Sequence, residues 1–510
     1  MSPAPAARGR RTPATLLAAS GLVALVLLVP LVFLLIEAGG AGLRDVAGLI
    51  WRPLTGMLLW NTVRLMVVVT ALSAVIGTLT AWCVERTDLP GRRVWAVLVV
   101  VPFAIPDFVV SFGWVSLTTW VQGYGGAILV MTLAVYPLVY LPVAASLRAA
   151  DPGQEEIARS LGVGRVRTFL RVTLGQARSA IFGGCILVAF ILLAEYGAFE
   201  ILGYRTFTTE IFSEFQVFDI PTACALSLVL VVLGIVVLGG DFAVRGRGRV
   251  AQVARPASRH RLGRATVPVV AAFALLVLLA LGVPVGASIY WVFEGGAHAI
   301  AGVSIFDAGW HTAVYSGVAA LLATVAALPV AMLSVRHPGR GGQLLERSTY
   351  LVLAMPGVVI AFALSYFSER YAGGLGYQSA PLLILAYAIL FFPLAYVGVR
   401  AAVARAPSAL DDVGRSLGIG RLGVLARVTL PLIGPGVAAA FCLVFLAAVT
   451  ELTATLLLIP TGVQTLATQF WAYEQNLSYG QAAPFALVII GLAAVPSYVV
   501  SRYFDRSPSR

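Results

Sequence analysis

The sequence contains no lysine, so all 35 of its lysine-or-arginine positions are arginine. A phosphate-binding P-loop requires lysine in its G-x-x-x-x-G-K-[ST] pattern, and this chain therefore cannot hold one. Chemistry through a lysine Schiff base is excluded for the same reason. If ATP hydrolysis drives this protein, another subunit must bind the nucleotide.

Histidine and cysteine are also scarce, with four residues of each type. The cysteines lie singly inside apolar runs, without the spacing of a metal site or a disulfide framework, and we expect small core residues. The histidines have no ligand spacing and no H-E-x-x-H motif, and we expect them to be solvated or interfacial. No Ser–His–carboxylate or paired-carboxylate arrangement stands out. These absences predict a chain without catalytic residues and leave any metal ligands unknown.

Charged residues make up only 11% of the chain, against 59% hydrophobic residues, and the mean hydropathy is +0.92. This composition excludes a soluble globular protein. The net charge of +12 could suggest nucleic acid, but no face is left for a groove-binding patch, so we predict a lipid bilayer and no nucleic-acid partner. A membrane-crossing helix needs about 20 apolar residues. The twelve candidate spans are 15–37, 59–84, 94–119, 125–147, 179–200, 221–241, 266–292, 312–334, 349–368, 379–399, 433–459 and 483–501.

Arginine is distributed unevenly between these spans. With the N-terminus inside, the predicted cytoplasmic segments contain 30 of the 35 arginines. Positive charge resists translocation, so this asymmetry predicts cytoplasmic N- and C-termini in a multi-pass protein. The first run could belong to a signal peptide, but its length of about 20 residues favours a retained span. The arginine-rich segment 245–264 could bind anionic lipid headgroups, although a solvated linker is the simpler interpretation.

One polar segment of the chain occurs twice. Residues 155–165 return 256 positions later as residues 411–421. When the sixteen residues from Arg159 are aligned with those from Arg415, ten are identical. Chance would give about one or two identities at ordinary residue frequencies.

The repeat extends well beyond this segment. A match of such length indicates two homologous halves, which we place at residues 1–262 and 263–510. Because each half holds six spans, both have the same orientation, and both copies of the polar segment fall in the cytoplasm between spans four and five. Other matched pairs are Asn61 with His311, Pro102 with Pro356, and Glu195 with Glu451.

Each copy of the polar segment predicts a short helix with an exposed apolar face and a glycine turn. Asp151 and Pro152 suit a helix start, and glycine suits the left-handed residue that ends a helix. Such a helix can seat in a partner's groove, or it can lie on the membrane surface. Its duplication within two six-span halves favours docking. The turn glycines are Gly162 and Gly164 in the first copy, and Gly418 and Gly420 in the second.

The first copy resembles the cytoplasmic Glu-Ala-Ala…Gly signature of permeases of binding-protein-dependent ABC importers. Glu156-Ile157-Ala158 through Gly162 to Leu174 carries the resemblance, and Asp412-Val413-Gly414 through Gly418 is similar more loosely. Gly175 departs from the pattern, since proline is usual there. The resemblance covers nearly the whole chain. It implies an all-α polytopic membrane protein of about 12 transmembrane helices, arranged as two parallel six-helix repeats in the type I (MetI-like) ABC importer permease fold.

In that family this loop docks into a cytoplasmic ATPase, which implies coupling loops at residues 151–175 and 407–431. The implied partners are a dimer of cytoplasmic ABC ATPase subunits, which uses ATP and Mg, and an extracytoplasmic substrate-binding protein. The chain itself would bind no cofactor, and it would lie in a bacterial inner membrane. The implied coupling residues are Glu155, Glu156, Ala158, Gly162 and Gly164 in the first loop, and Asp411, Asp412, Gly414, Gly418 and Gly420 in the second.

Fusion of two halves in one chain resembles the ferric-iron subfamily, with the segments that begin at Glu195 and Glu451 as the sharpest matches. Permeases for thiamine, phosphonate or another small solute remain alternatives, and a secondary transporter with parallel repeats is a more distant one. A carboxylate in hydrocarbon is costly, so Glu195 and Glu451 are candidates for lining the translocation path. They could instead reach the outer headgroups or pair with another residue.

Overall fold

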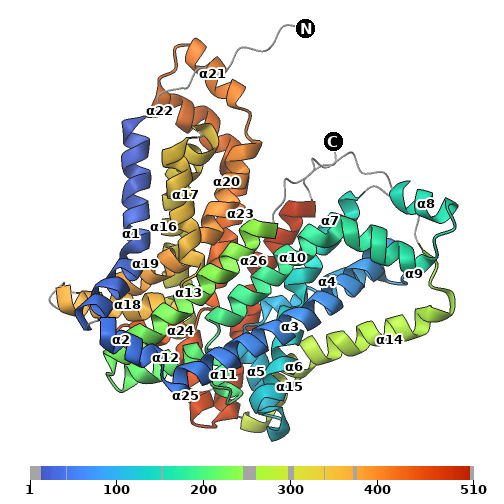
Figure 1. The fold of residues 1–510 in the computed structure, drawn as a ribbon, viewed down its shortest axis with the longest axis horizontal. Helices are drawn as coiled ribbons and strands as arrows, with labels where there is room; N and C mark the ends of the chain where they lie inside the picture. The colour runs from blue at the N-terminus through green and yellow to red at the C-terminus, as the bar shows by residue number, and fades with distance from the viewer. Residues whose placement is uncertain are drawn as a thin grey trace. The chain divides into compact units, whose positions relative to one another are not determined.

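A computed structural model of the protein describes residues 13–41, 43–150, 153–244, 260–296, 304–337, 339–371 and 376–505 (Figure 1). Within these ranges every regular element is a helix, apart from one isolated bridge between Thr87 and His260. The predicted all-α fold is confirmed. The predicted helix start at Asp151 and most of the arginine-rich segment lie outside the described residues.

Eight helices in the described residues are long and apolar enough to cross a membrane, and the number rises to 11 if each of three bent helix pairs is one span. These elements coincide with the first eleven predicted runs. The twelfth run falls on α26 (Tyr479–Asp505), of which Tyr479–Ala493 is a shorter apolar helix. The eight spans are Ala14–Gly40, Pro53–Arg86, Gly123–Ala149, Phe169–Ala194, Ile220–Gly240, Gly263–Gly295, Ile305–Arg336 and Leu425–Val449.

The third span of each half is sharply bent. The bend is 92° before α5 (Asp107–Val115) and 101° before α18 (Gly357–Tyr371). Pro106 and Pro356 precede these helices, and the carbonyl of each accepts hydrogen bonds from the backbone N–H groups three and four residues later. Pro356 therefore corresponds to Pro106, and the alignment of Pro102 with Pro356 was wrong. Proline explains the break because it disfavours helical angles in the residue before it.

Each fifth span begins with one turn of π-helix, at Phe169–Thr173 in the first half and Leu425–Thr429 in the second. Single π turns occur frequently at functional sites. The α-helices that follow stop at Ala194 and Val449, and short helices α11 (Gly197–Ile201) and α24 (Thr453–Leu458) come next. The predicted fifth spans 179–200 and 433–459 are therefore each broken near their C-terminal ends.

The chain forms two compact units that alternate along the sequence. Unit one comprises Met1–Leu35, Gly309–Gln464 and Ala494–Arg510, and unit two comprises Ile36–Ala308 and Thr465–Ala493. Helices α1 (Ala14–Ala41), α16 (Ile305–Arg336) and α26 contribute residues to both units. These units are defined by contacts rather than by the repeat, so the boundary between residues 262 and 263 stays a prediction.

Unit two is built around α3, α7 and α10, and Phe112 and Tyr479 pack edge to face within it. These three helices pack against one another. The helices of unit two are α2 (Leu43–Ile50), α3 (Pro53–Arg86), α4 (Arg92–Leu98), α5, α6 (Gly123–Val135), α7 (Pro137–Ala149), α8 (Gly153–Ser160), α9 (Arg165–Thr168), α10 (Leu174–Ala194), α11, α12 (Phe207–Gln216), α13 (Ile220–Val244), α14 (Thr266–Val277), α15 (Val283–Gly295) and α25 (Leu466–Gln475).

Unit one repeats this packing with α20 on α23 and α18 on α24. Phe33 of α1 lies against the rings of Tyr366, Phe367 and Tyr371 in α18. The other helices of unit one are α17 (Arg340–Leu353), α19 (Ala380–Leu390), α20 (Phe392–Arg405), α21 (Ser408–Ser416), α22 (Arg421–Val424) and α23 (Leu430–Val449).

Candidate functional site

The repeated polar segment forms the same local structure in both halves, a short helix and a left-handed glycine. Helix α8 is followed by Gly162 with φ +76°, and the N–H of Val163 donates to the carbonyl of Ala158 at 3.0 Å. Helix α21 is followed by Gly418 with φ +80°. This is the Schellman ending, whose left-handed residue costs a glycine little because it has no Cβ.

Gly164 and Gly420 have a different position in the turn. Neither has a positive φ, and a Cβ added at either would meet no atom within 4 Å. Their carbonyls accept the backbone N–H groups of Thr168 and Val424, both at 2.9 Å, and so begin the next short helices α9 and α22. The left-handed turn therefore depends on the first glycine of each pair.

Both short helices expose large apolar side chains. Ile157 and Leu161 are 61% and 76% exposed in the first copy, and Val413 and Leu417 are 53% and 74% exposed in the second. Glu156 and Asp412 are exposed beside them. A contiguous apolar surface with an acidic neighbour is typical of an interaction site. In Figure 1, α8 follows the end of α7, and α21 follows the end of α20.

Glu155 and Asp411 point away from this exposed face. They are only 2% and 8% exposed. An oxygen of each accepts a hydrogen bond of 2.9 Å from a threonine hydroxyl, that of Thr173 in the first copy and that of Thr429 in the second. Each threonine is the last residue of a π turn, so these two carboxylates tie the short helix to the start of the fifth span.

An arginine at the end of the second span of each half completes each arrangement, with a side chain that is 2% exposed for Arg86 and 12% exposed for Arg336. Arg86, at the end of α3, has a terminal nitrogen 3.9 Å from Glu155 Oε1, and Arg336, at the end of α16, has one 3.7 Å from Asp411 Oδ2. Removing one partner of a buried ion pair lowers the free energy of unfolding by about 3–5 kcal/mol. We call Arg86, Glu155 and Thr173 the first polar cluster, and Arg336, Asp411 and Thr429 the second.

The sequence alone did not single out these arginines or threonines, although the repeat contains the signal. Arg86 precedes Arg336 by 250 residues, the spacing already found for Asn61 and His311. Thr173 and Thr429 lie inside the aligned sixteen residues. Polar residues retained at matched positions near membrane edges could therefore have been paired.

The first polar cluster has an additional member, His260. Its Nε2 lies 3.6 Å from Glu155 Oε2, its ring stacks on Trp82, and its side chain is 16% exposed. The backbone N–H of His260 donates to the carbonyl of Arg86 at 2.8 Å, and its carbonyl accepts the N–H of Asp88 at 3.1 Å. His260 is therefore not fully solvated, and its predicted place at the membrane interface stays a prediction. The sequence could not show these contacts, because Glu155 and Trp82 are distant from His260 along the chain.

The looser second copy of the motif has a packing explanation. A Cβ on Gly414 would lie 3.1 Å from Cγ2 of Val424, which is tighter than ordinary contact. The equivalent residues of the first copy are Ala158, which is half-buried, and Thr168. Gly414 therefore leaves room for the side chain of Val424, which packs against it.

Glu195 and Glu451 lie in the breaks after the fifth spans. Glu195 Oε1 accepts the N–H of Ala198 at 2.7 Å, and Glu451 Oε1 accepts the N–H of Ala454 at 3.0 Å. Each carboxylate thus satisfies the first turn of the short helix that follows, where free N–H groups and the helix dipole favour a negative charge. These contacts give both carboxylates a local partner, and their function in the translocation path stays a prediction.

Glu474, near the end of α25, is a further acidic residue that no sequence pattern singled out. It is 6% exposed, and burial raises its pKa to about 7. The amide of Gln475 donates to its Oε2 at 3.2 Å, which opposes the effect of burial only in part.

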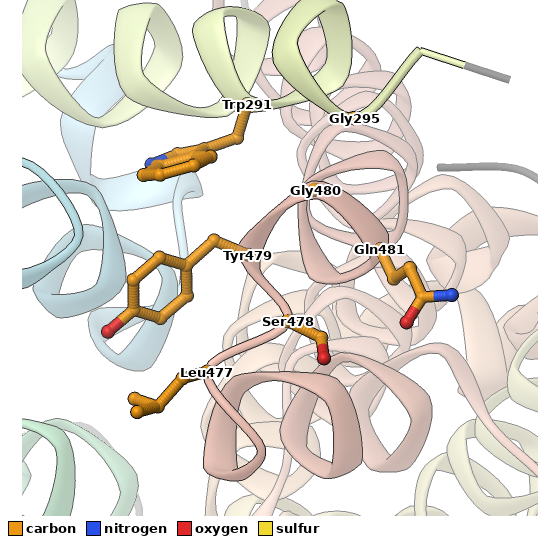
Figure 2. Close-up of a pocket in the computed structure, with 7 residues that line it drawn as sticks. All are labelled: Trp291, Gly295, Leu477, Ser478, Tyr479, Gly480 and Gln481. Carbon is orange, nitrogen blue, oxygen red and sulfur yellow. The ribbon is translucent and has the colours of Figure 1, made fainter. Parts of the chain in front are cut away.

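A small hollow of about 210 Å³ lies between the end of α15 and the start of α26 (Figure 2). The Trp291 ring meets that of Tyr479 at 5.2 Å, and Gly480 lets the two helix backbones approach closely. Figure 2 shows Tyr479 and Gln481 on opposite sides of α26. The hollow is smaller than the 300 Å³ and more of typical ligand pockets. Within the described residues, no group of three His, Cys, Asp or Glu side chains is arranged to hold a metal ion.

Two parts of the chain match one known protein family. Residues 73–244 and 319–510 each match the family described as "Binding-protein-dependent transport system inner membrane component". Each match includes one polar cluster and one exposed short helix. The chain belongs to this family, and it is a multi-pass inner membrane permease in which the family domain occurs twice.

Comparison with individual proteins finds permeases of known transport systems. The chain is 36% identical over 503 residues to the Fe(3+)-transport system permease protein FbpB 2 of Haemophilus influenzae, covering 97% of this chain and 99% of the relative. It is 21% identical to the ferric transport system permease protein FbpB of Actinobacillus pleuropneumoniae, over 83% of this chain and 67% of the relative. The sulfate transport system permease protein CysT of Salmonella typhimurium is 28% identical over 42% of this chain.

Proposed function

We propose that this chain is the membrane permease of an ATP-driven importer, and that it moves ferric iron from an extracytoplasmic binding protein into the cytoplasm. The observation that carries the proposal is the duplicated short helix with its exposed apolar face, within a chain that matches a ferric-iron permease over nearly its whole length. The sulfate permease is 28% identical over its matched part, below the 36% of the ferric-iron permease, which favours iron.

The exposed faces of α8 and α21 are the proposed docking surfaces for a dimer of cytoplasmic ATPase subunits. Because the chain has no lysine for a P-loop, ATP and Mg would be bound by those subunits. Burial of the apolar side chains of both helices would supply the docking energy. Replacing Leu161 and Leu417 by Asp should abolish copurification with the ATPase, and unchanged copurification would exclude these faces.

The orientation proposal has both termini and both short helices in the cytoplasm. It rests on the excess of arginine in the corresponding segments. Reporter fusions at Leu161 and Leu417 should read cytoplasmic, and fusions at Gln216 and Gln475 should read extracytoplasmic. Access to both short helices from outside would refute this orientation.

Cargo and energy source can be tested together in proteoliposomes with the ATPase and binding protein. Uptake of radiolabelled ferric iron should require ATP inside and no ion gradient. Uptake driven by an ion gradient without ATP would instead indicate a secondary transporter. Uptake of thiamine or phosphonate in place of iron would show that the proposed cargo is wrong, and the permease assignment would still hold.

The proposal that Glu195 and Glu451 line the path has a sharp test. Gln at either position keeps an oxygen that can accept the same backbone N–H bond, so the short helices stay capped while the charge is removed. Iron uptake should fall in the double Glu→Gln variant, with assembly and basal ATP hydrolysis retained. Unchanged uptake kinetics would remove both residues from the pathway.

A further inference from the structure

We infer that the two polar clusters are mechanical links, which make each short docking helix move together with the second and fifth spans of its own half. The inference rests on the proposed function, since it concerns how motion of the ATPase reaches the membrane. Arg86, Arg336, Thr173 and Thr429 are then positioning residues, which act through the carboxylates of Glu155 and Asp411.

The first argument is the contacts of the carboxylates. Glu155 belongs to α8, and two of its partners are Arg86 at the end of α3 and Thr173, the last π-helical residue before α10. One side chain therefore joins the docking helix to two spans at once. Asp411 of α21 makes the same two contacts, with the end of α16 and the last π-helical residue before α23.

The second argument is that this arrangement recurs despite changes around it. The acid is Glu in one half and Asp in the other, yet the hydroxyl–carboxylate distance is 2.9 Å in both. The arginines are offset by 250 residues and the acids by 256, so six residues have been gained or lost between them. A three-way contact that persists through this change in length is tied to the function of each half.

The third argument is that the ion pairs are not at their closest. Nitrogen–oxygen separations of 3.9 and 3.7 Å exceed the 2.7–2.9 Å of a charge-assisted hydrogen bond. The Nε atoms of Arg86 and Arg336 are buried without a hydrogen-bond partner among the described residues. The nitrogen–oxygen distance of each pair can therefore shorten when its docking helix shifts. Packed helices in other proteins switch between two discrete arrangements in this way.

The two links are unequal, because the first carboxylate also faces His260. The groups facing His260 are Glu155 from α8, the Trp82 ring from α3 and the Arg86 backbone at the end of α3. The C-terminal end of the segment between the halves is thus attached to the first link. Loss of one contact should harm the first link less than the second.

The test replaces each threonine by valine, which removes the hydroxyl and keeps the branched shape of the side chain. In proteoliposomes with the ATPase and binding protein, the double variant T173V/T429V should copurify with the ATPase and hydrolyse ATP within twofold of the unchanged chain. Ferric-iron uptake per ATP hydrolysed should fall at least tenfold. T173S/T429S keeps both hydroxyls and should restore uptake to within twofold. Of the single variants, T429V should lower uptake more than T173V.

The matched control is T168V. Thr168 is equally buried, but its hydroxyl donates to the backbone carbonyl of Val163, and valine already stands at the equivalent Val424. T168V should transport normally. Unchanged uptake per ATP in T173V/T429V, or an equal loss in T168V, would overturn the inference, as would loss of ATPase binding in T173V/T429V. If the double variant does not insert, T429V alone gives the same comparison. Absence of ATP-dependent uptake in the unchanged chain would instead refute the proposed function.

Discussion

Phe218 and Leu477 have a backbone conformation that glycine usually adopts. Their φ angles are +60° and +55°, and both follow Schellman-type endings, of α12 and α25, in which the next N–H donates to a carbonyl five residues earlier. Their side chains are 78% and 71% exposed, so little packing offsets the strain. For a non-glycine residue this conformation costs about 1–2 kcal/mol.

We therefore expect Phe218→Gly and Leu477→Gly each to raise the free energy of unfolding by about 1 kcal/mol. The measurement is thermal unfolding of the purified chain in detergent. Val217→Gly is the control, because that neighbour has a negative φ and should lower stability. No gain in either glycine variant would mean that the exposed side chains make stabilising contacts.

The buried carboxyl group of Glu474 predicts a pH dependence. Because its pKa is about 7 in the folded chain and about 4.3 in an unfolded one, the unfolded state loses its proton first as pH rises. Its contribution to stability is therefore present below about pH 4.3 and lost as pH rises through 7. The penalty above pH 7 is at most about 4 kcal/mol.

Glu474→Gln removes this penalty, so the variant should unfold at a higher temperature than the unchanged chain at pH 8. At pH 4.5 the two should differ little. Thermal unfolding of both proteins at the two pH values checks the prediction. A difference that is the same at both would show that Glu474 does not titrate in this range.

At the scale of elements, α10 crosses α7 with glycine at the contact. A Cβ on Gly184 would lie 2.7 Å from the Cα of Val139, whereas a Cβ on Gly183 would meet nothing within 4 Å. Small residues let membrane helices approach closely. The second half reverses the arrangement, since Gly398 of α20 meets Ala440 of α23.

We expect Gly184→Ala to lower the free energy of unfolding by about 1–3 kcal/mol, because backbone would have to move. Gly183→Ala is a matched control one residue away, and it should leave stability unchanged or slightly raised. Unfolding of the two variants in detergent gives the comparison. Equal effects would show that this crossing is not tightly packed.

The ends of the docking helices give another paired prediction. Gly162→Ala should weaken the turn by about 1 kcal/mol through backbone strain alone, since no atom is close to its Cβ position. Gly164→Ala should have no such cost, because its φ is not positive. We expect reduced iron uptake only for Gly162→Ala. Similar uptake in both variants would indicate that the turn adapts.

Much of the element pattern could be predicted because it depends on local properties of the sequence. Long apolar runs, the arginine asymmetry and the repeat predict the spans, and the glycine spacing predicts the turns after α8 and α21. The bend at Pro106 was missed because two prolines lay within four residues and sequence alone could not decide between them. The inward direction of Glu155 depends on Arg86 and Thr173, which the fold brings together across 69 and 18 residues.

At the scale of the whole molecule, the exposed faces of the docking helices belong to different compact units. The first is in unit two and the second in unit one, and each has its own polar cluster. Each unit thus contains one exposed short helix, one polar cluster and the two spans that the cluster contacts.

The alternation of the two units along the chain also imposes an order in time. Phe33 packs against Tyr366 within unit one, yet more than 270 residues separate Leu35 from Gly309. At roughly 5–20 residues per second, the ribosome needs about 15–55 s to make that interval. During this delay α1 resides in the bilayer without its unit-one neighbours, so its apolar length must keep it there unaided. The unit that receives the first described helix is therefore among the last parts of the molecule to be completed.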